Sequence, residues 1–220
     1  MKPERIIIIR HGESQGNTDK SIYRNVPDYA IPLTAKGRQQ SHDAGIELHE
    51  RLGDDSVMFY VSPFWRTRET YAGIAQAFTN YVMREDPRLR EQEWGHLREV
   101  DVTKAIEAKR DAYGRYFFRM PDGENGADVE DRVTTFLDTL HRDFEKPSFP
   151  RNVVLVTHGF TARIILKRWF HLSTENFEKM ANPPNCGYFS LKCGYHLNSK
   201  YSIEIGPKDE PIPAPWIWKP

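Results

Sequence analysis

The sequence predicts an α/β fold in three layers, with helices on both faces of a central, mostly parallel sheet. Two apolar runs, "RIIIIR" at 5–10 and "NVVLVTH" at 152–158, are rich in β-branched residues and show no alternation with polar ones. That pattern is typical of strands whose two faces are both covered. Helical patterns separate these runs along the chain, and strands that alternate with helices favour a parallel sheet.

The remaining elements follow in chain order from the same signals. The apolar run "VMFYVS" at 57–62 predicts a third buried strand, and residues 81–84 predict a short one. Apolar periodicity predicts four helices, the first of which follows the N-cap residue Thr34: 35–52, 67–78, 128–144 and 160–170. The charged and aromatic segment 97–126 ends in "PDGENG". We expect it to form one or two helices, either as a cap over the end of the sheet or as a peripheral helix pair.

Length and composition favour one domain over residues 1–205, followed by a proline-rich tail at 206–220 that is extended or irregular. The chain has 31 Lys and Arg and 31 Asp and Glu, so no global field draws it to nucleic acid or to an anionic membrane. No apolar run is long enough for a signal peptide or a membrane span, and we expect a soluble protein of the cytoplasm, with the nucleus as a second location. The two cysteines, Cys186 and Cys193, are expected to be reduced thiols.

Reactive residues follow three of the predicted strands. Open α/β sheets bind ligands outside the carboxyl ends of their strands, so we expect these residues to meet in one pocket. The segment "RLREQEWG" adds a carboxyl group to them. The candidate residues are Arg10, His11, Ser14 and Asn17 after the first strand, Arg66 after the second, Glu91 in the added segment, and His158 and Gly159 after the last strand.

The residue types favour a phosphoryl site without a metal or a cofactor. His11, His158 and Glu91 would be acceptable zinc ligands, but arginines aimed into the same pocket would repel a dication. Guanidinium groups match the oxygens of a phosphate with paired donors, and nearby cations keep an imidazole neutral and nucleophilic. A serine hydrolase and a P-loop protein are the rival classes; the chain lacks the GxSxG motif of the first and the glycine spacing of the second.

The motifs resemble those of a known family. "RHG" at the first strand end, an Arg after "SP", ExxxG from Glu91 and a late "HG" are similar to the histidine phosphatase superfamily, over roughly residues 5–168. This resemblance implies the three-layer phosphoglycerate mutase-like fold. "RLREQEWG" and "FFRMPDGEN" are similar to segments of the fungal and plant mutase-like broad-range acid phosphatases, in which Ser tends to stand where this chain has Asn125.

The resemblance also implies a role for each candidate residue. His11 would be the nucleophile that forms a phosphohistidine, and Glu91 would donate a proton to the leaving oxygen and later activate water. Three further side chains would surround the transferred phosphoryl group: Arg10, Arg66 and His158. Ser14, Asn17 and the backbone of Gly159 would help to bind or orient a small phosphorylated substrate.

Two departures from the mutases of this superfamily favour a phosphatase. The cap segment has no Arg-Arg pair, and Phe160 follows "HG" where the mutases have a polar residue. Mutase-type phosphoryl transfer and a non-catalytic phospho-ligand binding protein remain the alternatives. Arg115 and Arg119 are four residues apart, so they would share a helical face that suits a second anion, or else be exposed surface charges. The sequence does not predict the oligomeric state.

Overall fold

A six-stranded sheet forms the centre of the structure. The computed structural model describes residues 3–95, 99–193 and 201–206, and the side chains of residues 192–206 are not described. The strand order is β3-β2-β4-β1-β5-β6; the first four are parallel, β5 runs antiparallel to β1, and β6 antiparallel to β5. The strands are β1 (Arg5–Arg10), β2 (Val57–Val61), β3 (Tyr81–Glu85), β4 (Asn152–Thr157), β5 (Tyr188–Cys193) and β6 (Tyr201–Gly206).

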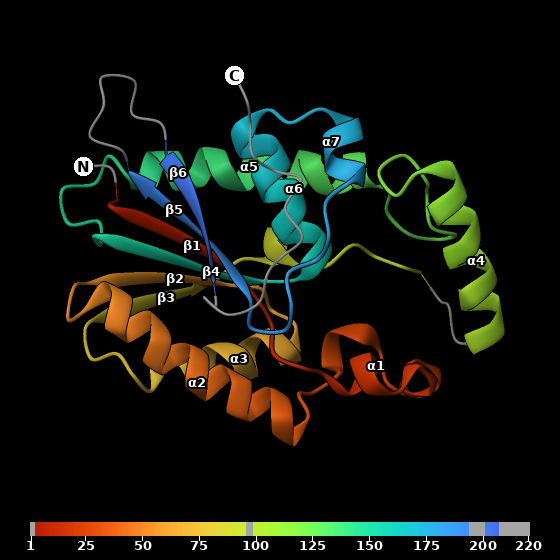
Figure 1. The fold of residues 1–220 in the computed structure, drawn as a ribbon, viewed down its shortest axis with the longest axis horizontal. Helices are drawn as coiled ribbons and strands as arrows, with labels where there is room; N and C mark the ends of the chain where they lie inside the picture. The colour runs from red at the N-terminus through yellow and green to blue at the C-terminus, as the bar shows by residue number, and fades with distance from the viewer. Residues whose placement is uncertain (1–2, 96–98, 194–200, 207–220) are drawn as a thin grey trace.

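Helices cover both faces of this sheet, as Figure 1 shows, so the predicted three-layer α/β fold is confirmed. Successive residues of a strand point to opposite faces, which gives two separate cores. Ile7 and Ile9 pack in one core under α2 (Ala35–Leu52) and α3 (Trp65–Ala75). Ile6 and Ile8 pack in the other, which is completed by α5 (Gly126–Asp143), α6 (Gly159–Phe170) and α7 (Thr174–Glu178).

Most of the predicted elements form within a few residues of the expected bounds. Helix α2 has the predicted bounds, because the Thr34 side chain accepts a hydrogen bond from the Gly37 N–H at 3.0 Å and so caps the first turn. Helix α3 begins two residues before the predicted start and ends at Ala75 rather than Phe78. The antiparallel strands β5 and β6 and the short helix α7 were not among the predicted elements.

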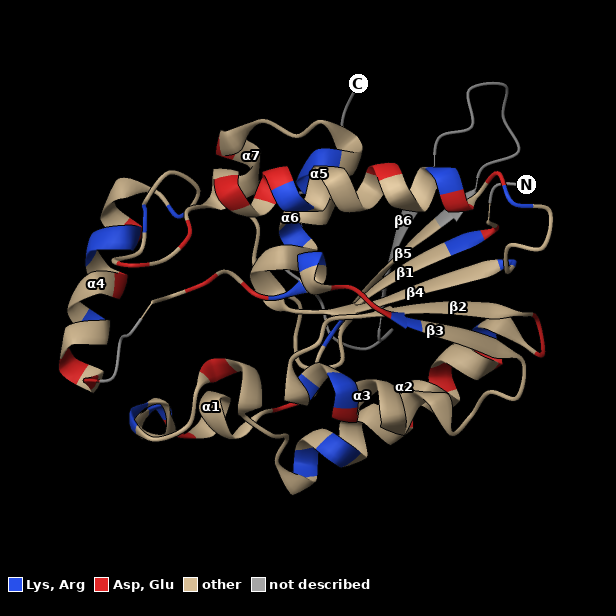
Figure 2. Ribbon diagram, turned by 180° about the vertical axis from the view of Figure 1, so that it is seen from behind, with Lys and Arg blue, Asp and Glu red and all other residues tan. Residues whose placement is uncertain are grey.

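The cap segment forms one helix, α4 (Val100–Tyr113), which stands away from the sheet (Figures 1 and 2). The helix ends at Gly114, whose φ of 108° few other residues adopt. Arg115 and Arg119 therefore do not share a helical face, and the prediction of a second anion site there is wrong. Arg115 pairs with Asp111 at 2.8 Å, and Arg119 pairs with Asp128 at 2.6 Å.

A long connection, residues 11–34, leads from β1 to α2 on the same side of the sheet as α4 (Figure 2). It contains three short helices that the sequence analysis did not predict: α1 (Gln15–Thr18), η1 (Lys20–Arg24) and η2 (Asp28–Ala30). The connection packs closely on α2, since a Cβ added at Gly37 would lie 2.0 Å from the Glu13 carbonyl oxygen. This contact fixes where the residues after β1 lie.

Several sequence predictions concern parts of the chain that are outside the described residues. No helix in the described ranges is long and apolar enough to cross a membrane. Cys186 is a free, buried thiol, whereas the side chain of Cys193 is not described. The tail beyond Gly206 also lies outside the described residues. The division into a domain at 1–205 and a tail therefore stays a prediction.

Candidate active site

The sheet register brings the two predicted histidines together. Arg10 of β1 pairs with Thr157 of β4, and His11 and His158 are the residues that come next on these parallel neighbours. Their ring centroids lie 5.2 Å apart. The two motifs that are farthest apart in the sequence thus form one site at the carboxyl edge of the sheet.

The His11 ring presents one nitrogen to the pocket. The side chain is 4% exposed, and its Nδ1 lies 2.7 Å from the Gly12 carbonyl oxygen. A carbonyl oxygen only accepts, so Nδ1 carries the proton and donates it to Gly12. The other nitrogen, Nε2, therefore has a free lone pair, as a nucleophile requires.

The pKa of His11 lies well below its usual value, because burial disfavours the charged imidazolium and the guanidinium groups of Arg66 and Arg10 repel it. The pKa of His158 is also well below its usual value, chiefly through burial and then through Arg66 and His11. Both rings are therefore neutral at pH 7.

His158 lies behind His11 rather than on the pocket surface. The side chain is fully buried and is not among the lining residues. Its Nε2 lies 2.8 Å from Ser62 Oγ, and its buried Nδ1 has no hydrogen-bond partner in the described structure. Ser62 is itself 0% exposed. A serine nucleophile at this Ser-His pair would have no access to a substrate, which argues against the serine hydrolase class.

The two arginines present partly free guanidinium groups. Arg66 Nη1 donates to the carbonyl and the carboxylate of Asp28 at 2.7 and 2.9 Å, and Nη2 donates to the same carboxylate at 3.3 Å. These contacts leave its Nε–H and one Nη2–H for an oxyanion. Arg10 Nη1 donates to the Pro183 carbonyl at 2.7 Å, and its buried Nε has no partner among the described residues.

Glu91 sits at the N-terminus of α6. Its Oε1 accepts hydrogen bonds from the Thr161 N–H and hydroxyl, both at 3.2 Å, and its Oε2 accepts from the Phe160 N–H at 3.3 Å. A helix N-terminus is a favourable place for a carboxylate, because its first N–H groups have no partners within the helix. Glu91 also lines the pocket, so its carboxyl group is both fixed and accessible.

The predicted substrate-binding residues divide into two groups. Ser14 and Asn17 line the pocket, whereas Gly159 lies at the buried start of α6. Asn17 Oδ1 accepts hydrogen bonds from the Ser14 N–H at 3.0 Å and from Asn185 Nδ2 at 3.2 Å. The amide Nδ2 of Asn17 remains as the group that can donate into the pocket.

Sequence reasoning missed three residues that shape the site. Asp28 pairs with Arg66 from 38 positions away, and the Tyr23 phenol lies near Asp28. Burial and the Asp28 carboxylate raise the pKa of Tyr23 to about 12, so it is a neutral donor. On α4, Arg110 is the only buried residue; its guanidinium lies 5.0 Å from the Trp94 ring and 5.1 Å from the Phe160 ring. No sequence pattern marks these contacts, which depend on the approach of distant segments.

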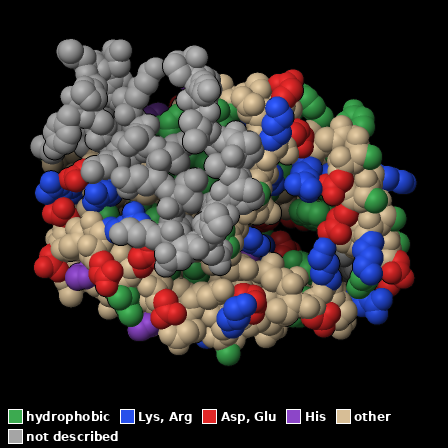
Figure 3. Space-filling model, in the orientation of Figure 1, with side chains coloured by type: hydrophobic (Ala, Val, Ile, Leu, Met, Phe, Trp, Pro, Cys, Tyr) green, Lys and Arg blue, Asp and Glu red, His purple; other side chains and the backbone are tan. Residues whose placement is uncertain are grey.

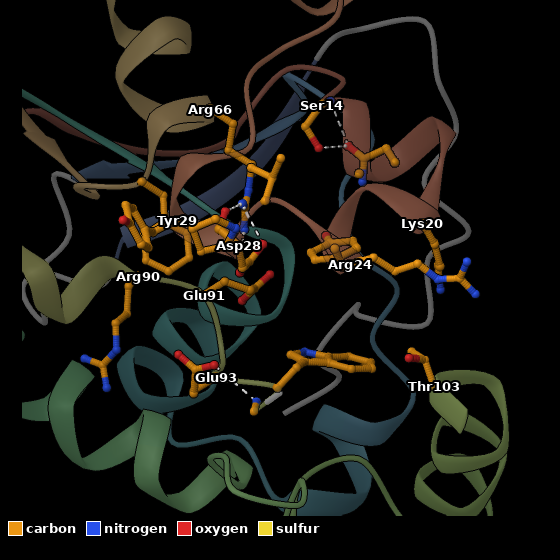
Figure 4. Close-up of a pocket in the computed structure, with 18 of the residues that line it drawn as sticks. Ser14, Lys20, Arg24, Asp28, Tyr29, Arg66, Arg90, Glu91, Glu93 and Thr103 are labelled. Carbon is orange, nitrogen blue, oxygen red and sulfur yellow. Dashed lines mark hydrogen bonds and ion pairs between the residues drawn. The ribbon is translucent and has the colours of Figure 1, made fainter. Parts of the chain in front are cut away.

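These side chains border a cavity of about 790 Å³ between the connection after β1 and the cap. The hollow is visible in Figure 3, and Figure 4 shows Arg66 and Asp28 at one side and Thr103 of α4 at the other. The volume exceeds what one phosphoryl group occupies and lies in the range of small-molecule sites. Apolar and aromatic lining residues complete it: Tyr23, Val26, Pro27, Tyr29, Phe64, Trp94 and Val100.

The same residues match a family model over residues 6–199, described as the histidine phosphatase superfamily, branch 1. The chain belongs to the histidine phosphatase superfamily. It is 39% identical to the phosphoglycerate mutase-like protein AT74 of Arabidopsis thaliana, over 99% of this chain and 73% of that protein. It is 28% identical to the broad-range acid phosphatase DET1 of Saccharomyces cerevisiae, over 94% of this chain and 90% of that protein.

Solved structures show the same fold. A mycobacterial glucosyl-3-phosphoglycerate phosphatase, solved as a complex with VO3, has a TM-score of 0.72 at 21% identity and covers 92% of this chain and 98% of its own. A second mycobacterial hydrolase has a TM-score of 0.72 at 21% identity and covers 93% of this chain and 97% of its own. The phosphoglycerate mutase-like fold expected from the sequence is therefore confirmed.

Proposed function

We propose that this member of the superfamily is a metal-independent phosphatase, which hydrolyses phosphomonoesters through a phosphohistidine on His11. The observation that carries the proposal is the free Nε2 of a neutral His11 beside Arg10 and Arg66. The family and the phosphatases among the relatives support the phosphatase class.

In the first step, His11 Nε2 attacks the phosphorus atom and the bond from phosphorus to the leaving oxygen breaks. The free N–H groups of Arg10 and Arg66 bind the equatorial oxygens, where charge is spread during phosphoryl transfer. The unpartnered Nδ1 of His158 can donate to one of these oxygens. A protonated Glu91 gives its proton to the leaving oxygen, and the alcohol departs.

In the second step, water attacks the phosphorus atom of the phosphohistidine. The Glu91 carboxylate accepts a proton from this water as the bond from Nε2 to phosphorus breaks, and inorganic phosphate leaves. The two steps together consume one water and return both side chains to their starting states. The fixed place of Glu91 at the start of α6 suits a group that acts in both steps.

Hydrolysis of an aryl phosphate in the presence of EDTA tests this function. Within the described residues, no group of three or more His, Cys, Asp or Glu side chains could hold a metal ion. We expect turnover to continue with EDTA and to be abolished by His11→Ala. Complete loss of wild-type activity with EDTA, restored by a divalent cation, would contradict the proposal.

Product analysis separates this phosphatase from a mutase. With 3-phosphoglycerate and its bisphosphate as substrates, we expect inorganic phosphate rather than an isomeric phosphoglycerate. Accumulation of the isomer at the rate of turnover would favour the mutase alternative. A cytoplasmic location stays a prediction, which imaging of the tagged protein can check.

A further inference from the structure

The outer part of the cavity carries cations that are already paired with carboxylates. Lys20 of η1 pairs with Glu107 of α4 at 2.6 Å, and Arg24 of η1 pairs with Glu99 at 2.9 Å. We call these four residues the rim. Lys20, Arg24 and Glu107 line the cavity, and Figure 4 shows Lys20 on the side away from Arg66. The rim therefore joins the connection after β1 to the cap through charge pairs.

The other lining charges also lack a free cation for a second anion. Arg90 is paired with Glu124 at 2.5 Å, and Arg66 is paired with Asp28. Glu93 and Asp122 line the cavity and form no ion pair with any described residue. These two carboxylates belong to adjoining segments, since the Glu124 N–H donates to the Glu93 carbonyl at 2.9 Å.

The lining charges of the described residues cancel before a substrate binds. Five are cationic, Arg10, Lys20, Arg24, Arg66 and Arg90, and five are carboxylates, Asp28, Glu91, Glu93, Glu107 and Asp122. A phosphate dianion brings two negative charges to the arginines at the floor. A second anion on the same substrate would then enter a cavity of net negative charge, and it could reach Lys20 or Arg24 only by displacing a carboxylate.

We propose that this arrangement selects phosphomonoesters whose leaving group carries no negative charge, and rejects those with a carboxylate or a second phosphate. The inference rests on the proposed phosphatase function and adds its substrate class. The apolar lining and the two unpaired carboxylates suit a neutral or cationic leaving group. The rim ion pairs act as specificity determinants because they occupy the cations that a second anion would need.

Three aryl phosphates of matched size test the substrate class: phenyl phosphate, 3-carboxyphenyl phosphate and 3-(aminomethyl)phenyl phosphate. A meta substituent leaves the basicity of the leaving oxygen nearly unchanged, so charge is the main variable. At low salt we expect kcat/KM for phenyl phosphate to exceed that for the carboxylated ester by about tenfold or more, the ratio that 1.4 kcal/mol produces. The amine should react at least as well as phenyl phosphate.

Equal kcat/KM for the neutral and carboxylated esters would overturn the inference and leave the phosphatase function intact. Failure to hydrolyse any of the three would instead contradict the proposed function. The two results are therefore distinguishable. Salt should narrow the preference, because the rim is partly exposed to solvent and its charges are screened.

Removing a rim carboxylate should release its cation for the substrate. We expect Glu107→Gln and Glu99→Gln each to raise kcat/KM for the carboxylated ester, relative to phenyl phosphate, by about two- to fivefold, which matches the strength of exposed ion pairs. Asp111→Asn is the matched control, since Asp111 lies on the same helix and pairs with Arg115 outside the cavity. An unchanged ratio in both rim variants, or an equal gain in the control, would overturn the role of the rim.

Discussion

Acidification should destabilise this protein through the two buried histidines. The pKa values of His11 and His158 in the folded chain lie well below 6.5, chiefly because of burial. The unfolded chain therefore binds a proton on each ring at a pH where the folded chain does not. Stability from these groups is complete above their unfolded pKa of about 6.5, and it is lost as the pH falls below that value towards the folded pKa.

The size of the effect follows from proton linkage. Each histidine that stays neutral in the folded chain costs about 1.2 kcal/mol of unfolding free energy between pH 7.0 and 5.5, so the pair costs about 2.5 kcal/mol. This is a large part of the 5–15 kcal/mol that holds a typical domain together. Replacing one of the rings by asparagine should remove about half of the pH dependence.

Urea unfolding at several pH values, in phosphate-free buffers, measures this effect. We expect the unfolding free energies of His11→Asn and His158→Asn to fall less steeply with acid than that of the wild type. His42→Asn, at an exposed position of α2, is the control for the loss of a histidine. Parallel curves for the wild type and both site variants would refute the reasoning, because they would mean that the buried rings take up protons in the folded chain.

Three further predictions follow from single contacts in the structure. Asp28→Asn leaves the buried Arg66 without its carboxylate; we expect a loss of about 1–2 kcal/mol in stability and a larger phosphate-induced rise in Tm than in the wild type, and equal rises would contradict this. Glu91→Gln should lower kcat/KM for an alkyl phosphate by about 100-fold or more, and clearly less for p-nitrophenyl phosphate, whose leaving oxygen needs no proton; an equal loss for both would argue against Glu91 as the proton donor. Gly37→Ala places a methyl group against the Glu13 carbonyl, and urea unfolding should show a loss of about 1–3 kcal/mol; an unchanged midpoint would show that the connection after β1 moves aside freely.

The sequence predicted the parts of the fold that local patterns determine. The runs of β1, β2 and β4 are apolar without alternation because helices cover both faces of these strands. Thr34 marked the start of α2 because its side chain caps the first turn. Strand β5 escaped prediction because it lies beside β1 as an antiparallel partner, a relation that depends on the whole sheet.

The candidate site was predictable to the same extent. His11 and His158 could be placed together because each follows a buried parallel strand, and the register then sets their distance. The ion pairs of Asp28, Lys20 and Arg24 could not be predicted, since they join segments from 38 to 87 residues apart and depend on how the cap approaches. The sequence therefore indicated the chemistry at the floor of the cavity, and the structure was needed to propose which leaving groups fit above it.

Trapping of the covalent intermediate tests the central claim most directly. Wild-type protein is mixed with a phosphomonoester labelled in its phosphoryl group, quenched within the first turnover, and digested to locate the label. The account predicts an acid-labile, base-stable phosphoryl group on His11, which is absent from His11→Ala. Label on Ser14, or full turnover by His11→Ala, would contradict it.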